Sequence, residues 1–199
     1  MRKHRFAVAA SLAMFVAVLA AGPALASAKR TRAVVYEAFA SSGKPAHRVQ
    51  RTLRGSCYVG AQSVNRDDAW RCTSGNELFD PCFSSAQAKG VVLCPSTPLS
   101  GSVTEIKLTK GLPTAMADKG KPSTSGVPWA LETTTGLKCV IDTGATNAIG
   151  RTRANYGCTK GTDWLWGDPA RKTEPWTISI APLNARRLKQ RVGIAEAWF

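Results

Sequence analysis

Short apolar stretches separated by Gly, Pro, Asn, Asp and Ser dominate the chain from about residue 46 onward. Several of them alternate apolar and polar side chains, which is the period of a half-buried β-strand. We therefore predict a mostly β, disulfide-stapled small domain with little helix, in which short antiparallel strands form a barrel- or sandwich-like structure. The predicted strands are 56–61, 69–72, 91–94, 103–110, 128–133, 137–142, 153–158, 163–166, 176–181 and 188–199.

Three other segments interrupt or connect these strands. Residues 134–136, Thr-Thr-Gly, are expected to form a hairpin turn between two strands. Residues 115–125 are rich in Gly, Pro, Ser and Lys and are expected to form an exposed loop. Residues 77–88 are the best candidate for one or two turns of helix.

The start of the chain has the three-part pattern of a secretory signal peptide, which we assign to residues 1–26. A cationic start is followed by the uncharged apolar run 6–21 and by Ala24-Leu25-Ala26, which places small residues where signal peptidase cleaves. The alternative is a transmembrane anchor. The apolar run is shorter than the roughly 20 residues that span a bilayer, and no later run is longer. We expect a secreted protein without a membrane span in its mature form.

Removal of residues 1–26 would leave 173 residues, which is enough for one domain with its own core. We divide this part into a basic N-terminal arm or edge strand, 27–52, and a Cys-rich β domain, 53–199. The formal charge of the whole chain is +14, and the first 26 residues contribute three of these positive charges, so the mature protein would carry +11. Such a charge favours anionic envelope polymers, acidic membranes or acidic glycans, or it serves solubility alone.

All six cysteines lie after the predicted signal peptide, at positions 57, 72, 82, 94, 139 and 158. An even number of cysteines in an exported chain indicates disulfides. A zinc site is the alternative, but the closest cysteines are ten residues apart and His47 is the single histidine after residue 26. We expect no metal and no other cofactor.

Two parts of the chain share one order of residues. Cys57 and Cys139 are each followed by a loop, the pattern aromatic-x-Cys-Thr-x-Gly, and Asp-Pro. The similarity is too short to establish duplication. Adjacent strands of a hairpin bring Cβ atoms close enough for a bridge, which predicts Cys57–Cys72 and Cys139–Cys158 and leaves Cys82–Cys94. Six cysteines permit 15 connectivities, and this is one of them.

Catalytic patterns are scarce. With His47 as the only histidine after residue 26, a Ser-His-Asp or Cys-His site has a single possible base, and no G-x-S-x-G elbow is present. A pair of carboxylates is the remaining option, and the weak candidates are Asp80 and Asp168, which hold equivalent places in the two similar stretches. The simpler interpretation is that Asp before Pro opens a turn and accepts hydrogen bonds from local amides.

Two surface patterns indicate binding. Trp164 and Trp166, separated by Leu165, would share one face of a strand and could stack on a sugar ring; alternatively they belong to the core. Arg187, Lys189 and Arg191 would alternate on the outer face of the predicted last strand and contact an anionic polymer. The alternative for this basic stripe is protection of an edge strand by charge.

The chain from about residue 53 to 199 resembles a family of uncharacterised, exported, six-cysteine actinobacterial proteins. The resemblance rests on short motifs around the cysteines, tryptophans and Asp-Pro pairs: Ala69-Trp70-Arg71-Cys72, Asp80-Pro81-Cys82-Phe83, Cys94-Pro95, Pro128-Trp129-Ala130-Leu131, Asn155-Tyr156-Gly157-Cys158 and Gly167-Asp168-Pro169. It implies a secreted small domain with paired cysteines and no particular activity or catalytic residue.

From these observations we expect a secreted, non-enzymatic, monomeric binding domain that contacts an anionic polymer or glycan of the cell envelope or its surroundings. Nucleic acid is not an expected partner. A small carboxylate-dependent glycan hydrolase and a protein-binding inhibitor or effector, contacting its partner through loop 115–125, are the alternatives.

Overall fold

The structure is a computed structural model that describes residues 30–114, 119–188 and 190–199. The regular structure of these residues consists of strands, and none of them forms a helix. This confirms the predicted mostly β, disulfide-stapled, barrel-like fold. The predicted signal peptide lies outside the described residues.

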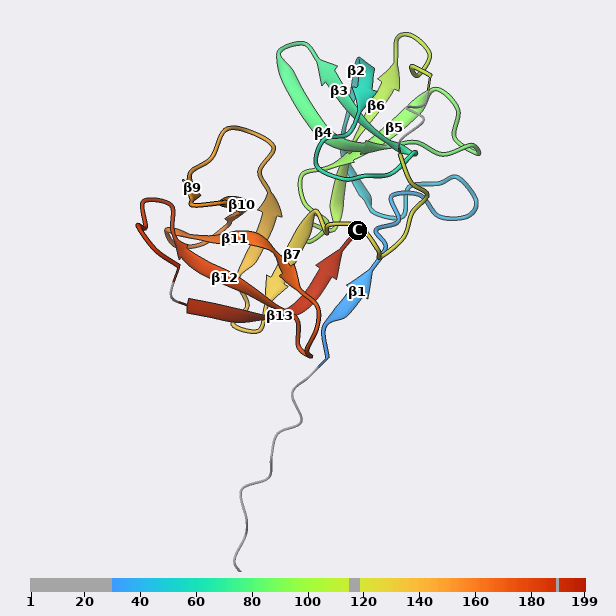
Figure 1. Ribbon diagram of the computed structural model, residues 1–199. Coiled ribbons are helices and arrows are strands. Elements are labelled where there is room, and N and C mark those ends of the chain that lie inside the picture. The colour runs from blue at the N-terminus through green and yellow to red at the C-terminus, as the bar shows by residue number, and fades with distance from the viewer. Residues whose placement is uncertain (1–29, 115–118, 189) are drawn as a thin grey trace, which may run out of the picture.

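The first half of the described chain forms a closed five-stranded barrel, called barrel 1 here (Figure 1). Each strand is antiparallel to the next, and because the number of strands is odd, the first and last meet in parallel. Its strands are β2 (Arg48–Gly60), β3 (Ala69–Ser74), β4 (Glu77–Phe83), β5 (Val91–Pro95) and β6 (Ser102–Leu108).

The second half forms another closed sheet, barrel 2, in the order β7-β8-β10-β11-β12-β13, because β13 pairs back with β7. A short strand β9 pairs with β10, and β1 adds to β13 in parallel. The strands are β1 (Arg32–Val34), β7 (Ala130–Thr133), β8 (Lys138–Ile141), β9 (Ala148–Ile149), β10 (Thr152–Cys158), β11 (Asp163–Ala170), β12 (Thr177–Pro182) and β13 (Gln190–Trp198).

Each barrel has its own core. Barrel 1 is filled by Val92, Ile106, Trp70 and two disulfides, and barrel 2 by Leu131, Leu165, Ile178 and Ile194 among others. All are buried, and their alternation with outward-facing residues is the pattern that predicted these strands.

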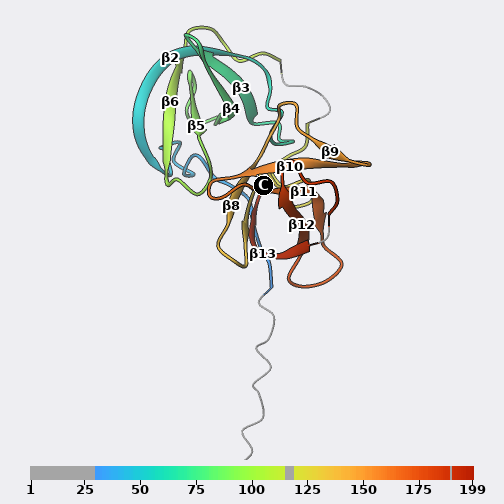
Figure 2. The same cartoon turned by 90° about the vertical axis from the view of Figure 1, so that its left-hand side faces the viewer.

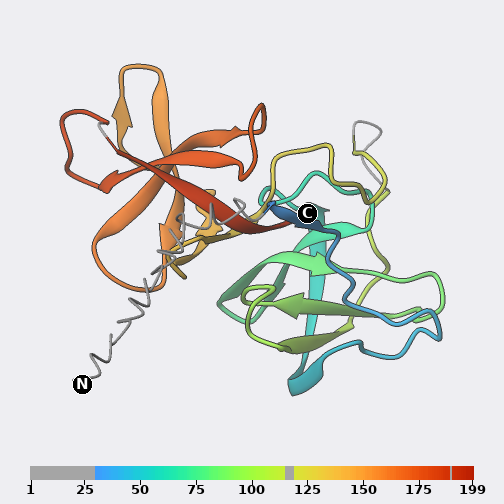
Figure 3. The ribbon, with the colours of Figure 1, turned by 90° about the horizontal axis from the view of Figure 1, so that it is seen from below.

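A third apolar cluster joins the two barrels, which lie side by side in Figures 2 and 3. It contains Phe83 of barrel 1, Trp129 and Trp198 of barrel 2, and Tyr36 of the N-terminal segment. The expected boundary between residues 52 and 53 falls inside β2, and the segment from residue 30 onward is built into both barrels. The chain after residue 53 is therefore two barrels in contact.

The three disulfides are those predicted from the sequence. Cys57–Cys72 and Cys82–Cys94 lie in barrel 1, and Cys139–Cys158 joins β8 to β10 in barrel 2. The hairpin at 134–136 is also confirmed, with Gly136 at a φ of 82°. Such a set of bridges fits an extracellular or otherwise oxidising environment.

The expected helical turn at 77–88 is wrong, because Glu77–Phe83 is strand β4. This strand is hard to predict from the sequence because Pro81 lies within it, and a proline usually marks the end of a strand. In the register of β3 and β4, Trp70 pairs with Cys82, and Cys72 pairs with Phe79. The two residues Asp80 and Pro81 are therefore opposite the single residue Arg71. This is a β-bulge, where a proline is tolerated.

In β11, Asp168 and Pro169 also lie in an irregular stretch, between Trp166 and Ala170. The two similar sequence stretches thus form corresponding strands of the two barrels.

Candidate functional site

The carboxylate of Asp80 is an acceptor inside the fold. Its oxygens accept hydrogen bonds from the amide of Gln62 at 3.1 Å, and from the amide and hydroxyl of Ser63 at 3.2 and 2.6 Å. Arg71 lies 3.7 Å away, and the Asp80 side chain is 7% exposed. This geometry supports the simpler interpretation that Asp before Pro binds backbone amides, here those of the connection between β2 and β3.

Asp168 has a different environment in the other barrel. It is exposed and accepts one hydrogen bond, from the Asn155 amide at 3.1 Å. The phenol of the buried Tyr156 donates to the Pro128 carbonyl at 2.8 Å. Burial raises the pKa of the Tyr156 phenol far above its ordinary value, and the Asp168 charge raises this pKa further. Asp80 lies in barrel 1 and Asp168 in barrel 2, and in the described residues the two carboxylates share no hydrogen-bond partner.

We predict that Asp80→Asn lowers the free energy of unfolding by about 1–3 kcal/mol, because one acceptor oxygen and the charge facing Arg71 are lost. Asp168→Asn is the matched control and should change it by less than about 0.5 kcal/mol, as expected of an exposed site. Urea unfolding followed by circular dichroism measures both. Equal stability of the two variants would contradict the anchoring role of Asp80.

Trp164 and Trp166 share a face of β11, as predicted, but this face is covered. Trp166 is 1% exposed and its indole donates to the Ala181 carbonyl at 3.0 Å. Leu183, Leu188 and Trp164 itself pack against the buried cluster that contains Trp166, and Leu165 fills the barrel on the opposite face. Trp166 therefore belongs to the core and offers no ring face to a ligand; Trp164 is half-buried.

The predicted basic stripe does not form as expected. The last strand begins at Gln190, so Arg187 lies in the preceding bend and not on the strand. Lys189 lies outside the described residues. Arg191 is on the strand, but its guanidinium donates to the hydroxyl and carbonyl of Thr177. Arg187 and Arg191 therefore do not alternate along one strand face.

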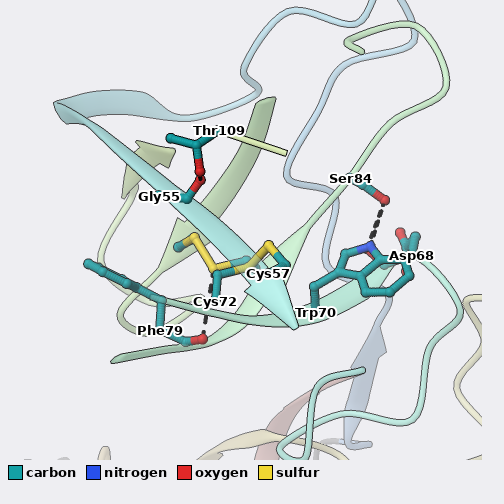
Figure 4. The surroundings of a disulfide bond; sticks show 10 residues. Gly55, Cys57, Asp68, Trp70, Cys72, Phe79, Ser84 and Thr109 are labelled. Atoms are coloured by element: carbon teal, nitrogen blue, oxygen red, sulfur yellow. Dashed lines mark hydrogen bonds between the residues drawn. A yellow bond between two sulfur atoms is a disulfide. The ribbon is translucent and has the colours of Figure 1, made fainter. Parts of the chain in front are cut away.

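Pairing of the barrel 1 strands instead creates a different group of cations. Arg54 of β2 is the register partner of Lys107 of β6, so the two exposed side chains point to the same side, on strands about 4.8 Å apart. Lys89 and Lys110 line a hollow of about 490 Å³ at the same end of the barrel. The backbone links these positions: Thr109 donates to the Gly55 carbonyl (Figure 4), and the Leu108 amide donates to the Gly90 carbonyl. We call Arg54, Lys89, Lys107 and Lys110 the basic cluster.

The basic cluster has no acidic partner in the described ranges. Four ion pairs occur there, all made by arginines: Arg32–Glu196, Arg51–Glu77, Arg66–Asp68 and Arg71–Asp80. Glu105, two residues before Lys107, contacts the hydroxyl of Thr52. Like charges on register partners destabilise a sheet, and such a violation of a local rule is expected at functional sites. Sequence reasoning missed this cluster because its members come from separate strands and turns.

The described residues hold neither a metal-binding cluster nor a membrane-spanning helix. No group of three or more His, Cys, Asp or Glu side chains there is placed to hold a metal ion. None of the described segments is a helix long and apolar enough to cross a bilayer.

Comparisons with known proteins found no family model, no curated protein and no solved structure that matches this chain.

Proposed function

We propose that the protein is an exported, non-enzymatic module that binds an anionic polymer of the cell envelope or its surroundings. The observation that carries this proposal is the basic cluster, in which four exposed cations gather at one end of barrel 1 without acidic partners in the described part of the chain. After removal of residues 1–26, which carry three of the +14 formal charges, the remaining +11 adds a long-range attraction to the same partner.

Export is supported by two independent features. Residues 1–26 have the charge and hydropathy pattern of a signal peptide. The three disulfides fit an oxidising compartment, where DNA and RNA are not the usual anions. Envelope polymers and acidic glycans remain as abundant multivalent anions, and the resemblance to exported six-cysteine proteins points the same way.

Binding to such a polymer should be strongly salt-dependent, because each cation that contacts it releases a counterion. We predict that the purified protein co-sediments with cell-wall material at low salt and dissociates as salt rises. For nucleic acids, each neutralised charge contributes about 0.7–0.9 to the slope of log affinity against log salt. A triple variant with Lys89→Gln, Lys107→Gln and Lys110→Gln should therefore reduce the magnitude of this slope by about 2 to 3.

The matched control removes the same charge from barrel 2, by Lys138→Gln, Lys160→Gln and Lys172→Gln, all exposed positions. It should retain most of the binding and most of the slope. Equal losses in both triple variants would show that diffuse charge, and not the basic cluster, binds the polymer. Absence of co-sedimentation at low salt would overturn the proposed function.

A further inference from the structure

We propose that the basic cluster is one half of a site for an acidic polysaccharide, and that the other half is a neighbouring polar hollow which takes a sugar ring. This inference rests on the proposed function, since it names the class of anionic polymer that the same surface binds. It is carried by two hollows on barrel 1 that share one wall.

The first hollow has a volume of about 570 Å³, within the range of about 300–1,000 Å³ typical of ligand sites. It lies between the N-terminal segment 37–46 and the residues that follow β4. Phe39, which is half-buried, provides aromatic surface, while Glu37, Asp68 and Gln87 provide polar groups. A sugar ring has apolar C–H faces and a rim of hydroxyls, so it needs both kinds of surface.

Asp68 is a fixed acceptor in this hollow. Arg66 donates to its two carboxylate oxygens at 2.9 and 2.7 Å, and the carboxylate keeps 29% of its side-chain surface exposed. A carboxylate oxygen accepts more than one hydrogen bond, so Asp68 can also accept from ligand hydroxyls without moving. Arg66 balances the charge of Asp68 and Glu37 adds a negative one, so this hollow disfavours an anion and suits a neutral polyhydroxyl group.

The second hollow has the opposite electrostatic character. Lys89 and Lys110 stand at its rim, over a floor that includes Val91, Leu108 and Leu112. In the described residues neither lysine is in an ion pair. An anionic group at this rim would meet two ammonium groups with Arg54 and Lys107 close by.

Residues 84–86 form the wall that the two hollows share. Ser84 fixes this wall, because its hydroxyl accepts from the Trp70 indole at 3.0 Å and donates to the main-chain oxygen of Asp68 at 3.2 Å (Figure 4). A ligand that crosses the wall therefore meets a polar hollow that disfavours anions on one side and a cationic hollow on the other. A polymer that carries both sugar rings and anionic groups matches this order.

Three defined polymers test the inference: hyaluronate, in which neutral and anionic sugar rings alternate, polyphosphate of equal total charge, and neutral dextran, each titrated into the purified protein at low salt. We expect hyaluronate to bind about tenfold more tightly than polyphosphate, and dextran to bind far more weakly than either. Ala40→Trp, which fills the first hollow from an exposed position, should reduce hyaluronate affinity about tenfold and leave polyphosphate within twofold. Gln87→Ala adds no bulk and should cause a smaller loss for hyaluronate only.

Ala148→Trp adds the same side chain at an exposed position of barrel 2 and should change neither affinity. Equal affinity for hyaluronate and polyphosphate, or an unaltered preference in both Ala40→Trp and Gln87→Ala, would overturn the sugar subsite and leave the proposed function standing. Dextran binding as tightly as hyaluronate would also overturn the inference. Failure of both polyanions to bind would overturn the proposed function with it.

Discussion

Loss of all three disulfides should leave the protein unfolded at 25 °C. The bridges close loops with sequence separations of 15, 12 and 19 residues. Each such loop restricts the unfolded chain enough to stabilise the fold by about 3 kcal/mol, so the three together contribute about 9 kcal/mol. A domain of ordinary stability has about 5–15 kcal/mol in all, and most of that would be lost.

Paired Cys→Ala substitutions test this prediction better than a reducing agent, because five of the six cysteines are buried and would react slowly. Removing Cys82–Cys94 leaves barrel 1 with one bridge, whereas removing Cys139–Cys158 leaves barrel 2 with none. Limited proteolysis should therefore cut barrel 2 first in the Cys139→Ala, Cys158→Ala variant and leave barrel 1 protected. A triple-pair variant with an unchanged urea midpoint would contradict the prediction.

Arg66→Ala should be the most damaging single substitution of a charged residue in the structure. Arg66 is 3% exposed, and its guanidinium donates to Asp68, to the Tyr36 carbonyl at 2.7 Å and to the main-chain oxygen of Phe199 at 3.2 Å. It also lies over the Phe83 ring, 4.7 Å from the centroid. Truncation leaves these acceptors without a donor, and we expect a loss of about 3–5 kcal/mol in the free energy of unfolding.

Arg51→Ala is the matched control for this prediction. Arg51 forms a bidentate ion pair with Glu77, like that of Arg66 with Asp68, but both side chains of this pair are about half exposed. Such a surface pair contributes about 0–1 kcal/mol. Urea unfolding compares the two, and hydrogen exchange at the Tyr36 amide, which donates to Phe199, should accelerate only in Arg66→Ala. Equal effects of the two substitutions would show that Arg66 does not hold the junction of the barrels.

Much of the fold could be predicted because alternation of apolar and polar residues reports directly on strands. The pattern located most strands and, with the spacing of the cysteines, all three bridges. It could not show that β2 pairs with β3 along one half and with β6 along the other, and this double pairing closes barrel 1 separately from barrel 2. Strand β4 was missed because Asp80 and Pro81 lie in a bulge, where a proline no longer marks the end of a strand.

The candidate site was less predictable for a related reason. Alternation placed Trp164 and Trp166 on one face, but whether that face is open depends on the segment containing Leu183 and Leu188, which packs across it. The basic cluster depends on the register of β2 and β6, which brings Arg54 beside Lys107 although 53 positions separate them. A pattern read along the chain contains no information on register between distant strands.

The pairing of β1 with β13 also sets an order of events during synthesis. Among the described strands β1 comes first and its partner β13 comes last, with Arg32 opposite Glu196 and Val34 opposite Trp198. A chain that emerges from its N-terminal side can close barrel 1 early from contiguous strands, but β1 has no partner until β13 has emerged. The first described strand to be made is therefore among the last to be placed, and a chain that stalls before β13 presents an unpaired β1 edge to proteases and to other chains.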